Sequence, residues 1–270
     1  MTVRYVSFGA GLNSAALAVG IVEHAMPVNG LIFSDTGGER PDVYESLDRV
    51  SAYLQAHGYP AIEITRWTRV RAPYAGQHID LETDCLRKQN LPSLAYGMKG
   101  CSVKFKAQPL DKAVKAHADA AAELAAGRKV ERLIGYSADE LKRVMRSRPS
   151  NEWKFRYPLY EWGWGRDECE EAVARAGLGP VAKSACFFCP AHTEPEIVQL
   201  GKVYPKLLQR ALDIEANAVA KNADVVPSLQ GVRGRPWREV WAAHLAGEPV
   251  KSGRMQLPCE CFDGSWTDEE

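Results

Sequence analysis

The chain has 270 residues, and its 34 basic and 34 acidic side chains leave no formal net charge at pH 7. Overall charge therefore does not attract nucleic acid, and any such attraction has to come from a local surface. No stretch approaches the roughly 18 uninterrupted apolar residues of a membrane span, and the opening MTVRYVSF lacks the features of a secretory signal. We therefore expect a cytoplasmic protein that does not enter a membrane.

Strands and helices alternate along the first part of the chain. The pattern predicts a buried strand over 3–8, a helix over 13–25, a strand over 28–35, a helix over 41–57 and a third strand over 61–67. The second helix begins with Pro41, a residue favoured in the first turn of helices. Such alternation indicates parallel βαβ units, which bind ligands at the carboxyl ends of their strands.

Residues 67–108 show no clear periodicity. With its flanks this stretch is rich in basic residues and poor in acidic ones after Asp80; the basic residues are Arg66, Arg69, Arg71, Arg87, Lys88, Lys99, Lys104 and Lys106. We interpret it as a functional insertion with a basic face; a solvated surface without function is the alternative. Farther along, we expect helices over 109–126, 138–146 and 166–176, a strand over 131–136, a helical region over 194–222, and loops with short helices from 223.

The first strand runs into a glycine-containing turn. Gly9 and Gly11 permit backbone conformations closed to other residues, and the helix that begins near Asn13 offers N–H groups to an anion. Ser14 adds a hydroxyl group. The turn lacks the lysine of a Walker loop and the glycine spacing of a dinucleotide-binding fingerprint. On its own, it is consistent both with a phosphate loop and with a tight turn between a strand and a helix.

Cysteines are the second chemical signal. They stand at positions 85, 101, 169, 186, 189, 259 and 261. In a reducing compartment, clustered cysteines indicate metal or redox chemistry rather than disulfides. The pair Cys186-Phe-Phe-Cys189 has a spacing with which two thiolates grip one zinc ion or one iron–sulfur cluster. Two further ligands have to come from elsewhere.

The second strand-to-helix turn points to a family. Asp35-Thr36-Gly37 with Pro41 and Tyr44, taken with the glycine turn, resembles the DTGxxxPxxY and SGGxDS motifs of the PAPS reductase-like branch of the adenine-nucleotide α-hydrolase (PP-loop ATP pyrophosphatase) superfamily. Further stretches agree in the same order: CSVKFKAQPL (101–110), GYSADELKR (135–143), YPLYEWGWGRDE (157–168) and CFFCP (186–190). The resemblance implies an α/β fold with a Rossmann-like, three-layer parallel sheet of the HUP type. It implies a nucleotide-binding domain over 1–190, with a helical C-terminal extension over 191–270.

The chain also departs from the family pattern. Asn13 replaces an aspartate, which removes a carboxylate ligand for magnesium, and Ala10 replaces the second glycine of the first loop. Ser137 stands where the family has an arginine, and Cys101 stands alone where assimilatory reductases have two adjacent cysteines. These departures place the chain, by resemblance, nearer to phage-borne and DNA-sulfur-modification relatives.

The resemblance implies an enzyme that binds ATP or phosphoadenylyl sulfate, with or without magnesium, and carries out sulfonucleotide reduction or thiolation. The cofactor-binding residues that it implies are Ser7, Gly9, Gly11, Asn13, Ser14, Asp35, Thr36, Gly37 and Gly135. The implied catalytic residues are Lys104 and Arg143, which with Lys106 neutralise phosphate or sulfonate charge, and Cys261, in a tail segment that loosely resembles the nucleophile segment of assimilatory reductases.

The resemblance adds Cys101 to Cys186 and Cys189 as metal ligands. No motif fixes the fourth ligand, for which we choose Cys169, with Cys85 as its rival. Four thiolates and the family favour a [4Fe–4S] cluster over zinc. Two competing functions are an ATP pyrophosphatase that transfers no sulfur and a zinc-stabilised accessory protein that binds nucleic acid through residues 66–106. A thiol-redox partner at the C-terminal tail and a homodimer are left open.

Overall fold

The computed structural model describes residues 2–69, 71, 73–92, 100–146, 149–221 and 235–250. Five parallel strands form one sheet in the order β3-β2-β1-β4-β5. Their bounds are Arg4–Phe8 (β1), Gly30–Asp35 (β2), Ile62–Arg66 (β3), Val130–Ile134 (β4) and Trp153–Arg156 (β5). The strand order reverses between β1 and β4, so the switch point, where ligands bind in sheets of this kind, lies at the carboxyl ends of these strands. The expected Rossmann-like α/β fold is confirmed.

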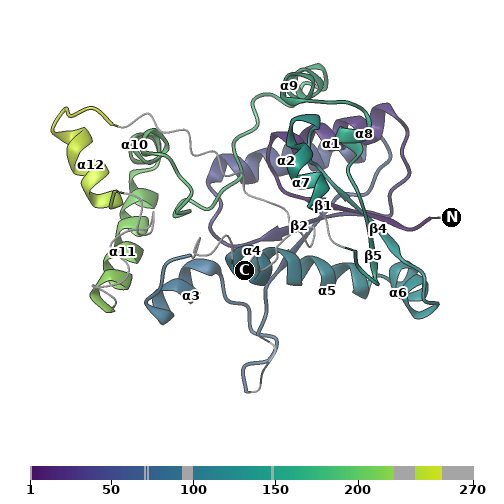
Figure 1. The fold of residues 1–270 in the computed structure, drawn as a ribbon, viewed down its shortest axis with the longest axis horizontal. Coiled ribbons are helices and arrows are strands. Elements are labelled where there is room, and N and C mark those ends of the chain that lie inside the picture. The colour runs from purple at the N-terminus through teal and green to yellow at the C-terminus, as the bar shows by residue number, and fades with distance from the viewer. Residues whose placement is uncertain are drawn as a thin grey trace.

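Helices cover both faces of the sheet (Figure 1). Val6 and Phe8 point toward a core shared with α1 (Leu12–Glu23), α2 (Pro41–Ala56) and α9 (Arg166–Arg175). Tyr5, one residue earlier on the same strand, points toward the opposite layer of α5 (Gln108–Ala116) and α6 (Ala118–Ala125). This alternation is the two-residue period of a strand, and it produces the three expected layers. The short elements η3 (Ala138–Glu140), α7 (Leu141–Met145) and α8 (Pro158–Glu161) follow β4 and β5.

A second group of helices lies beside the sheet (Figure 1). It contains α10 (Glu194–Val203), α11 (Pro205–Lys221) and α12 (Trp237–Leu245), together with α3 (Leu81–Lys88). The segments α4 (Gly100–Ser102) and the π-helical η2 (Val103–Ala107) lead directly into α5. Phe105, Phe187 and Ile197 share the apolar core of this second group. Because this core draws residues from both sides of position 190, the domain division at that residue stays a prediction. No helix in the part of the chain described by the structure is long and apolar enough to cross a membrane.

Several predicted elements differ in the structure. The stretch 67–108 contains α3, whose cap the sequence analysis missed: the Asp80 side chain accepts the Thr83 N–H at 2.6 Å. The predicted helix over 109–126 is divided at His117, which has an extended backbone (φ −76°, ψ 132°). The helical region over 194–222 is divided at Tyr204, the residue before Pro205, because a proline disfavours helical geometry in its predecessor. Strand β5 was not predicted, since four residues are too few to establish a period.

The sheet buries one carboxylate among cations from its two neighbouring strands. Glu131 on β4 lies opposite Arg4 on β1 and Lys154 on β5. Its carboxylate accepts from Arg4 Nε and Lys154 Nζ, both at 2.8 Å, and lies 3.5 Å from Arg156. Burial alone would raise the pKa of Glu131, but these hydrogen bonds and charges outweigh it and lower the pKa to about 2.

A group whose pKa is lowered on folding stabilises the protein above its unfolded pKa, and this stability is lost as the pH falls through the folded pKa. We therefore expect the Glu131 contribution to the free energy of unfolding to be complete above pH 4.5 and lost toward pH 2. Glu131→Gln is expected to be less stable at pH 7 and to show a weaker pH dependence between these values. Urea denaturation at several pH values measures both effects. Glu170→Gln, at an exposed ion pair, is the control, and an equal change in both variants would contradict the prediction.

Candidate functional site

The glycine turn lies between β1 and α1. Gly11 caps α1 without a side-chain hydrogen bond to the first helical turn, so no capping side chain occupies the N–H groups there. The Ser14 hydroxyl oxygen accepts the Gly9 N–H at 2.9 Å and holds the turn closed. Ala10 has φ +57°, in the left-handed region that favours glycine. The turn therefore has the backbone form of an anion-binding loop, with some strain at Ala10.

The end of β4 packs against the start of α1. A Cβ at Gly135 would lie 3.0 Å from the Asn13 carbonyl oxygen, so a side chain there would be crowded. The Asn13 side chain donates to Glu140 Oε2 at 2.9 Å. Two residues that were each predicted to bind the cofactor thus lie side by side, and the amide of Asn13 binds a carboxylate of the protein.

Glu140 organises the turn after β4. It accepts the Ser137 N–H at 3.1 Å and forms an ion pair with Arg143, whose guanidinium carbon lies 3.9 Å from the centre of the Tyr136 ring. The predicted catalytic Arg143 is therefore placed near the start of α1, through its partner Glu140. The sequence analysis did not single out Glu140 as a site residue, although the Ser-x-x-Glu spacing of a capping box marks it.

The turn after β2 is held by its own aspartate. Asp35 is 3% exposed, and its Oδ1 accepts the Gly37 N–H and the Tyr44 hydroxyl, both at 2.8 Å. Its Oδ2 lies 2.9 Å from Arg66 Nη2. Burial, followed by the hydrogen bond to Asp35, raises the pKa of Tyr44 well above its usual range. The predicted contact of Asp35 with a nucleoside stays a prediction, and in this structure its carboxylate fixes the shape of the turn.

The same turn receives the CFFC segment. The Gly38 carbonyl accepts the Phe187 N–H at 2.7 Å, and Thr36 Oγ1 lies 3.1 Å from Cys186 Sγ. A Cβ at Gly38 would lie 2.8 Å from the Phe188 ring and 3.1 Å from Cys186 Cβ. Glycine is favoured at these two adjacent positions for different reasons. Gly37 has a left-handed backbone with φ +75°, whereas the missing side chain of Gly38 leaves room for Cys186 and Phe188.

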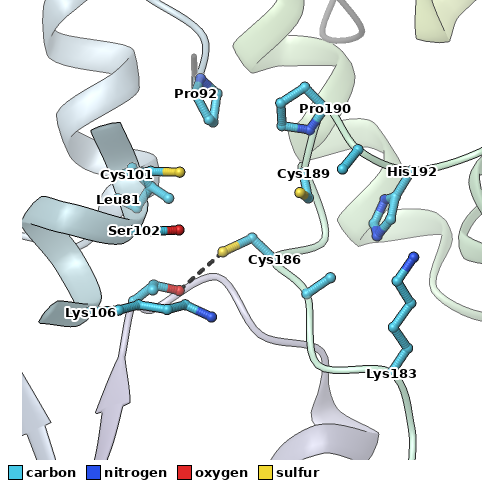
Figure 2. Close-up of a pocket in the computed structure, with 13 residues that line it drawn as sticks. Leu81, Pro92, Cys101, Ser102, Lys106, Lys183, Cys186, Cys189, Pro190 and His192 are labelled. Atoms are coloured by element: carbon cyan, nitrogen blue, oxygen red, sulfur yellow. Dashed lines mark hydrogen bonds between the residues drawn. The ribbon is translucent and has the colours of Figure 1, made fainter. Parts of the chain in front are cut away.

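A pocket lies between this turn, the α4–η2 segment and the CFFC segment. Figure 2 shows Cys101 on one side of it and Cys186 and Cys189 on the other. Polar groups in its wall come from Thr36, Ser102, Lys106, Lys183 and His192. The glycine turn is not part of this wall, but a Cβ at Gly11 would lie 3.7 Å from Ser184, the residue before the lining residue Ala185. Three of the four predicted metal ligands are thus brought to one pocket near the predicted phosphate loop.

Lys106, rather than Lys104, reaches this pocket. Lys106 is 9% exposed, and its Nζ lies 3.6 Å from Glu39 Oε1. Lys104, two residues earlier, lies on another side of the helical turn, with its Nζ 2.9 Å from Asp84 and 4.1 Å from the centre of the Trp67 ring. The catalytic role of Lys104 stays a prediction, and its side chain is not part of the pocket wall. Lys106, which was predicted to neutralise charge together with Lys104, is part of that wall.

Two acidic side chains, the buried Glu39 and the partly exposed Glu196, support the lysines of the pocket. The Glu39 side chain is fully buried and accepts from Ser184 Oγ at 3.4 Å, besides facing Lys106. Glu196 Oε1 lies 2.7 Å from Lys183 Nζ. Burial, which outweighs the charge of Glu196, lowers the pKa of His192 to about 4, so its imidazole is neutral at pH 7.

The other predicted residues lie elsewhere. Cys169 is fully buried in the core between α1 and α9, away from the apolar cluster that contains the pocket cysteines. Its rival Cys85, on α3, belongs to the pocket cluster but is not part of the pocket wall. The Ser7 hydroxyl accepts from Arg132 at 2.8 Å under the α5 layer, because side chains alternate along β1. Cys259, Cys261 and Lys99 lie outside the described residues.

The pocket cysteines fit a metal or cluster by donor chemistry. Three thiols with apolar neighbours line one space, as a cluster site requires. Among the residues that the structure describes, however, no three His, Cys, Asp or Glu side chains already form a metal-binding arrangement. Cys186 Sγ instead contacts Thr36 Oγ1. The structure therefore supplies three donors of the right kind, and it does not complete the set with Cys169.

Burial, assisted by Asp84, raises the pKa of the Cys85 thiol to about 12, and burial with Glu168 does the same for Cys169. At pH 8, about one thiol in ten thousand would then be ionised, and the thiolate is the reactive form. We expect neither cysteine to be alkylated by iodoacetamide in the native protein at pH 8, whereas both react in urea. Mass spectrometry of the peptides measures this. Native labelling at the denatured rate would show that these side chains are accessible.

No protein-family model and no curated protein sequence matches this chain. Among solved structures, it is similar to the U34-tRNA thiolase NcsA from Methanococcus maripaludis with its [4Fe-4S] cluster. The TM-score is 0.40 and the sequence identity 14%, over 99% of this chain and 78% of that chain. A likeness at this level says nothing of what this chain binds or does.

Proposed function

We propose that the protein is an adenine-nucleotide-dependent enzyme of sulfur chemistry, with the nucleotide at the glycine turn and the reacting sulfur in the thiol-lined pocket. One observation carries this proposal: Cys101, Cys186 and Cys189 come from two separate segments to one pocket, and its wall includes Thr36, directly after β2, at the carboxyl end of the strand next to β1. If the three cysteines only filled a hydrophobic core, nothing would require them to lie at this end of the sheet.

The nucleotide half of the proposal rests on the turn and the helix behind it. Phosphate oxygens would accept hydrogen bonds from the N–H groups at the start of α1, where the helix dipole also favours negative charge. The Asp35–Gly37 turn, at the end of the adjacent strand β2, is the proposed neighbour of the nucleoside. Arg143 adds positive charge on the side of β4. ATP and phosphoadenylyl sulfate are the two candidate nucleotides.

The sulfur half rests on the charge and polarity of the pocket. Lys106 and Lys183 place ammonium groups in its wall, and Leu81 and Pro190 contribute apolar surface. Glu39 and Glu196 lie beside these ammonium groups, whose N–H donors would in addition stabilise a thiolate or the anionic sulfonate of a nucleotide. The proposed reaction class is therefore reduction of a sulfonucleotide or thiolation of an activated acceptor.

We propose Cys101, Cys186 and Cys189 as the ligands of an iron–sulfur cluster, and we leave Cys169 out of this proposal because it is buried in another core. A bound cluster would supply electrons for a reduction, or an iron site that carries sulfur for a transfer. The chain's own contribution is to hold the three thiols beside Lys106 and to limit the access of water with Phe187 and Phe188, which are both nearly fully buried.

The set of ligands can be tested by a matched pair of variants. After anaerobic purification, Cys186→Ala is expected to lose most of its iron and acid-labile sulfide, because one of three anchoring thiols is missing. Cys169→Ala is expected to keep the wild-type content, and circular dichroism checks that both variants are folded. Stoichiometric zinc in the wild-type protein would overturn the cluster. Loss of iron in both variants would return Cys169 to the ligand set.

The phosphate loop can be tested at Gly11. Its backbone is extended (φ −104°, ψ −179°), and a Cβ there has only ordinary contacts at 3.7 Å, so Gly11→Val is expected to fold. The branched side chain would cover the first N–H groups of α1, and we expect affinity for ATP or phosphoadenylyl sulfate to fall at least about tenfold. Isothermal titration calorimetry measures this. Ala121→Val, on exposed α6, is the control, and unchanged affinity in Gly11→Val would place the nucleotide elsewhere.

A further inference from the structure

The chain between β3 and α3 forms a loop that extends away from the body of the protein (Figure 1). We call its described residues 67–69, 71 and 73–79 the basic loop. Its two arms are joined by hydrogen bonds from the Arg69 N–H to the Gln77 carbonyl and from the Gly76 N–H to the Arg69 carbonyl, both 2.8 Å. Thr68 and His78 form an antiparallel bridge at its base. The loop is thus a hairpin-like projection with its own backbone pairing.

The basic loop contains no acidic residue, since the sequence over 67–79 is WTRVRAPYAGQHI. Neither Arg69 nor Arg71 forms an ion pair with any residue that the structure describes. Elsewhere in the stretch predicted to be basic, four cations meet carboxylates: Arg66 meets Asp35, Lys88 and Lys104 share Asp84, and Lys106 meets Glu39. Arg87, on α3, forms no ion pair with a described residue. The positive charge expected over residues 66–106 is therefore partly cancelled outside the projection and retained on it.

An aromatic ring accompanies these arginines. Tyr74 is 50% exposed, and the Arg69 guanidinium carbon lies 4.7 Å from the centre of its ring. On α5, Lys112 Nζ donates to Thr68 Oγ1 at 3.3 Å and adds a further cation at the base. Guanidinium groups bind phosphates through paired hydrogen bonds, and exposed aromatic rings stack on unpaired bases. A membrane surface or an acidic peptide would be attracted by the positive charge, but neither has unpaired bases that could stack on the planar Arg69–Tyr74 pair.

From this combination we propose that the basic loop binds single-stranded nucleic acid, with Arg69 and Arg71 on phosphates and Tyr74 stacked on a base. The base of the loop leads to the pocket: Trp67 packs at 5.5 Å between ring centres on Phe105, which lies on the turn that carries Lys106. A strand bound along the loop would thus be directed toward the thiols. That nucleic acid is the acceptor of the sulfur rests on the proposed function. The contact between the basic loop and a nucleic acid does not depend on that function.

The test is fluorescence anisotropy with labelled 20-nucleotide RNA and DNA of the same sequence, single-stranded and duplex, at several salt concentrations. Arg69→Ala/Arg71→Ala is expected to lower single-strand affinity at least tenfold and to reduce the slope of log K against log salt by about 1.4, or roughly 0.7 for each lost phosphate contact. Tyr74→Ala is expected to lower affinity at least about fivefold with little change in that slope. The RNA and DNA arms show which sugar is preferred.

The matched control is Arg128→Ala/Arg175→Ala, which removes the same charge at two exposed positions elsewhere and is expected to bind within twofold of wild type. Equal loss in both double variants, tighter binding of the duplex, or no binding by the wild type at 50 mM salt would each overturn the proposal. ATP affinity and iron content are measured on the same preparations. If the protein binds the oligonucleotide but has neither ATP affinity nor iron, the proposed function is wrong and the loop contact stands. If it binds ATP and contains iron but does not bind the oligonucleotide, the loop contact is wrong and the proposed function stands.

Discussion

The arrangement of the site depends on the docking of the CFFC segment onto the turn after β2. One backbone hydrogen bond, from Phe187 to Gly38, and one contact between Thr36 and Cys186 bring a segment from late in the chain to the end of a central strand. Phe188 and Cys186 occupy the space where a side chain at Gly38 would lie. Without this contact the pocket has only one wall, the glycine turn loses its neighbour Ser184, and the helical group has no attachment at this point.

Two buried carboxylates add a second constraint. Asp35 and Glu39 flank the docking turn with fully or nearly fully buried side chains, and an isolated buried charge is strongly unfavourable. Arg66 and Lys106 reduce that cost, so the end of β3 and the η2 segment have to lie where they do. Packing and electrostatics therefore act on the same few residues, which explains why the pocket is held by segments distant in sequence. Lys106 consequently lies between the Glu39 carboxylate on one side and the pocket thiols on the other.

The strands and helices of the first βαβ units could be predicted from sequence because apolar runs and turn residues there are unambiguous. The meeting of Cys101 with Cys186 and Cys189 was predicted from motif order rather than from periodicity. Other features depend on tertiary contacts that a local pattern does not encode. The sequence around Cys169 is equally compatible with a side chain packed under α1 and with a metal ligand. Only the fold distinguishes these two roles. The contact of Glu140 with Asn13 and that of Glu39 with Lys106 are likewise visible only when these partners, far away in sequence, are in place.

The π-helical turn Val103–Ala107 has a consequence for how this segment tolerates change. A turn of this kind accommodates one more residue than an α-helix, and each residue of an α-helix rotates the chain by about 100°. The extra residue therefore sets the angular phase between Cys101, before the turn, and α5, after it. Removing one residue here would turn one side of the pocket away from the other while leaving every remaining side chain chemically intact. In homologous chains, the length of this segment should accordingly vary less than its composition.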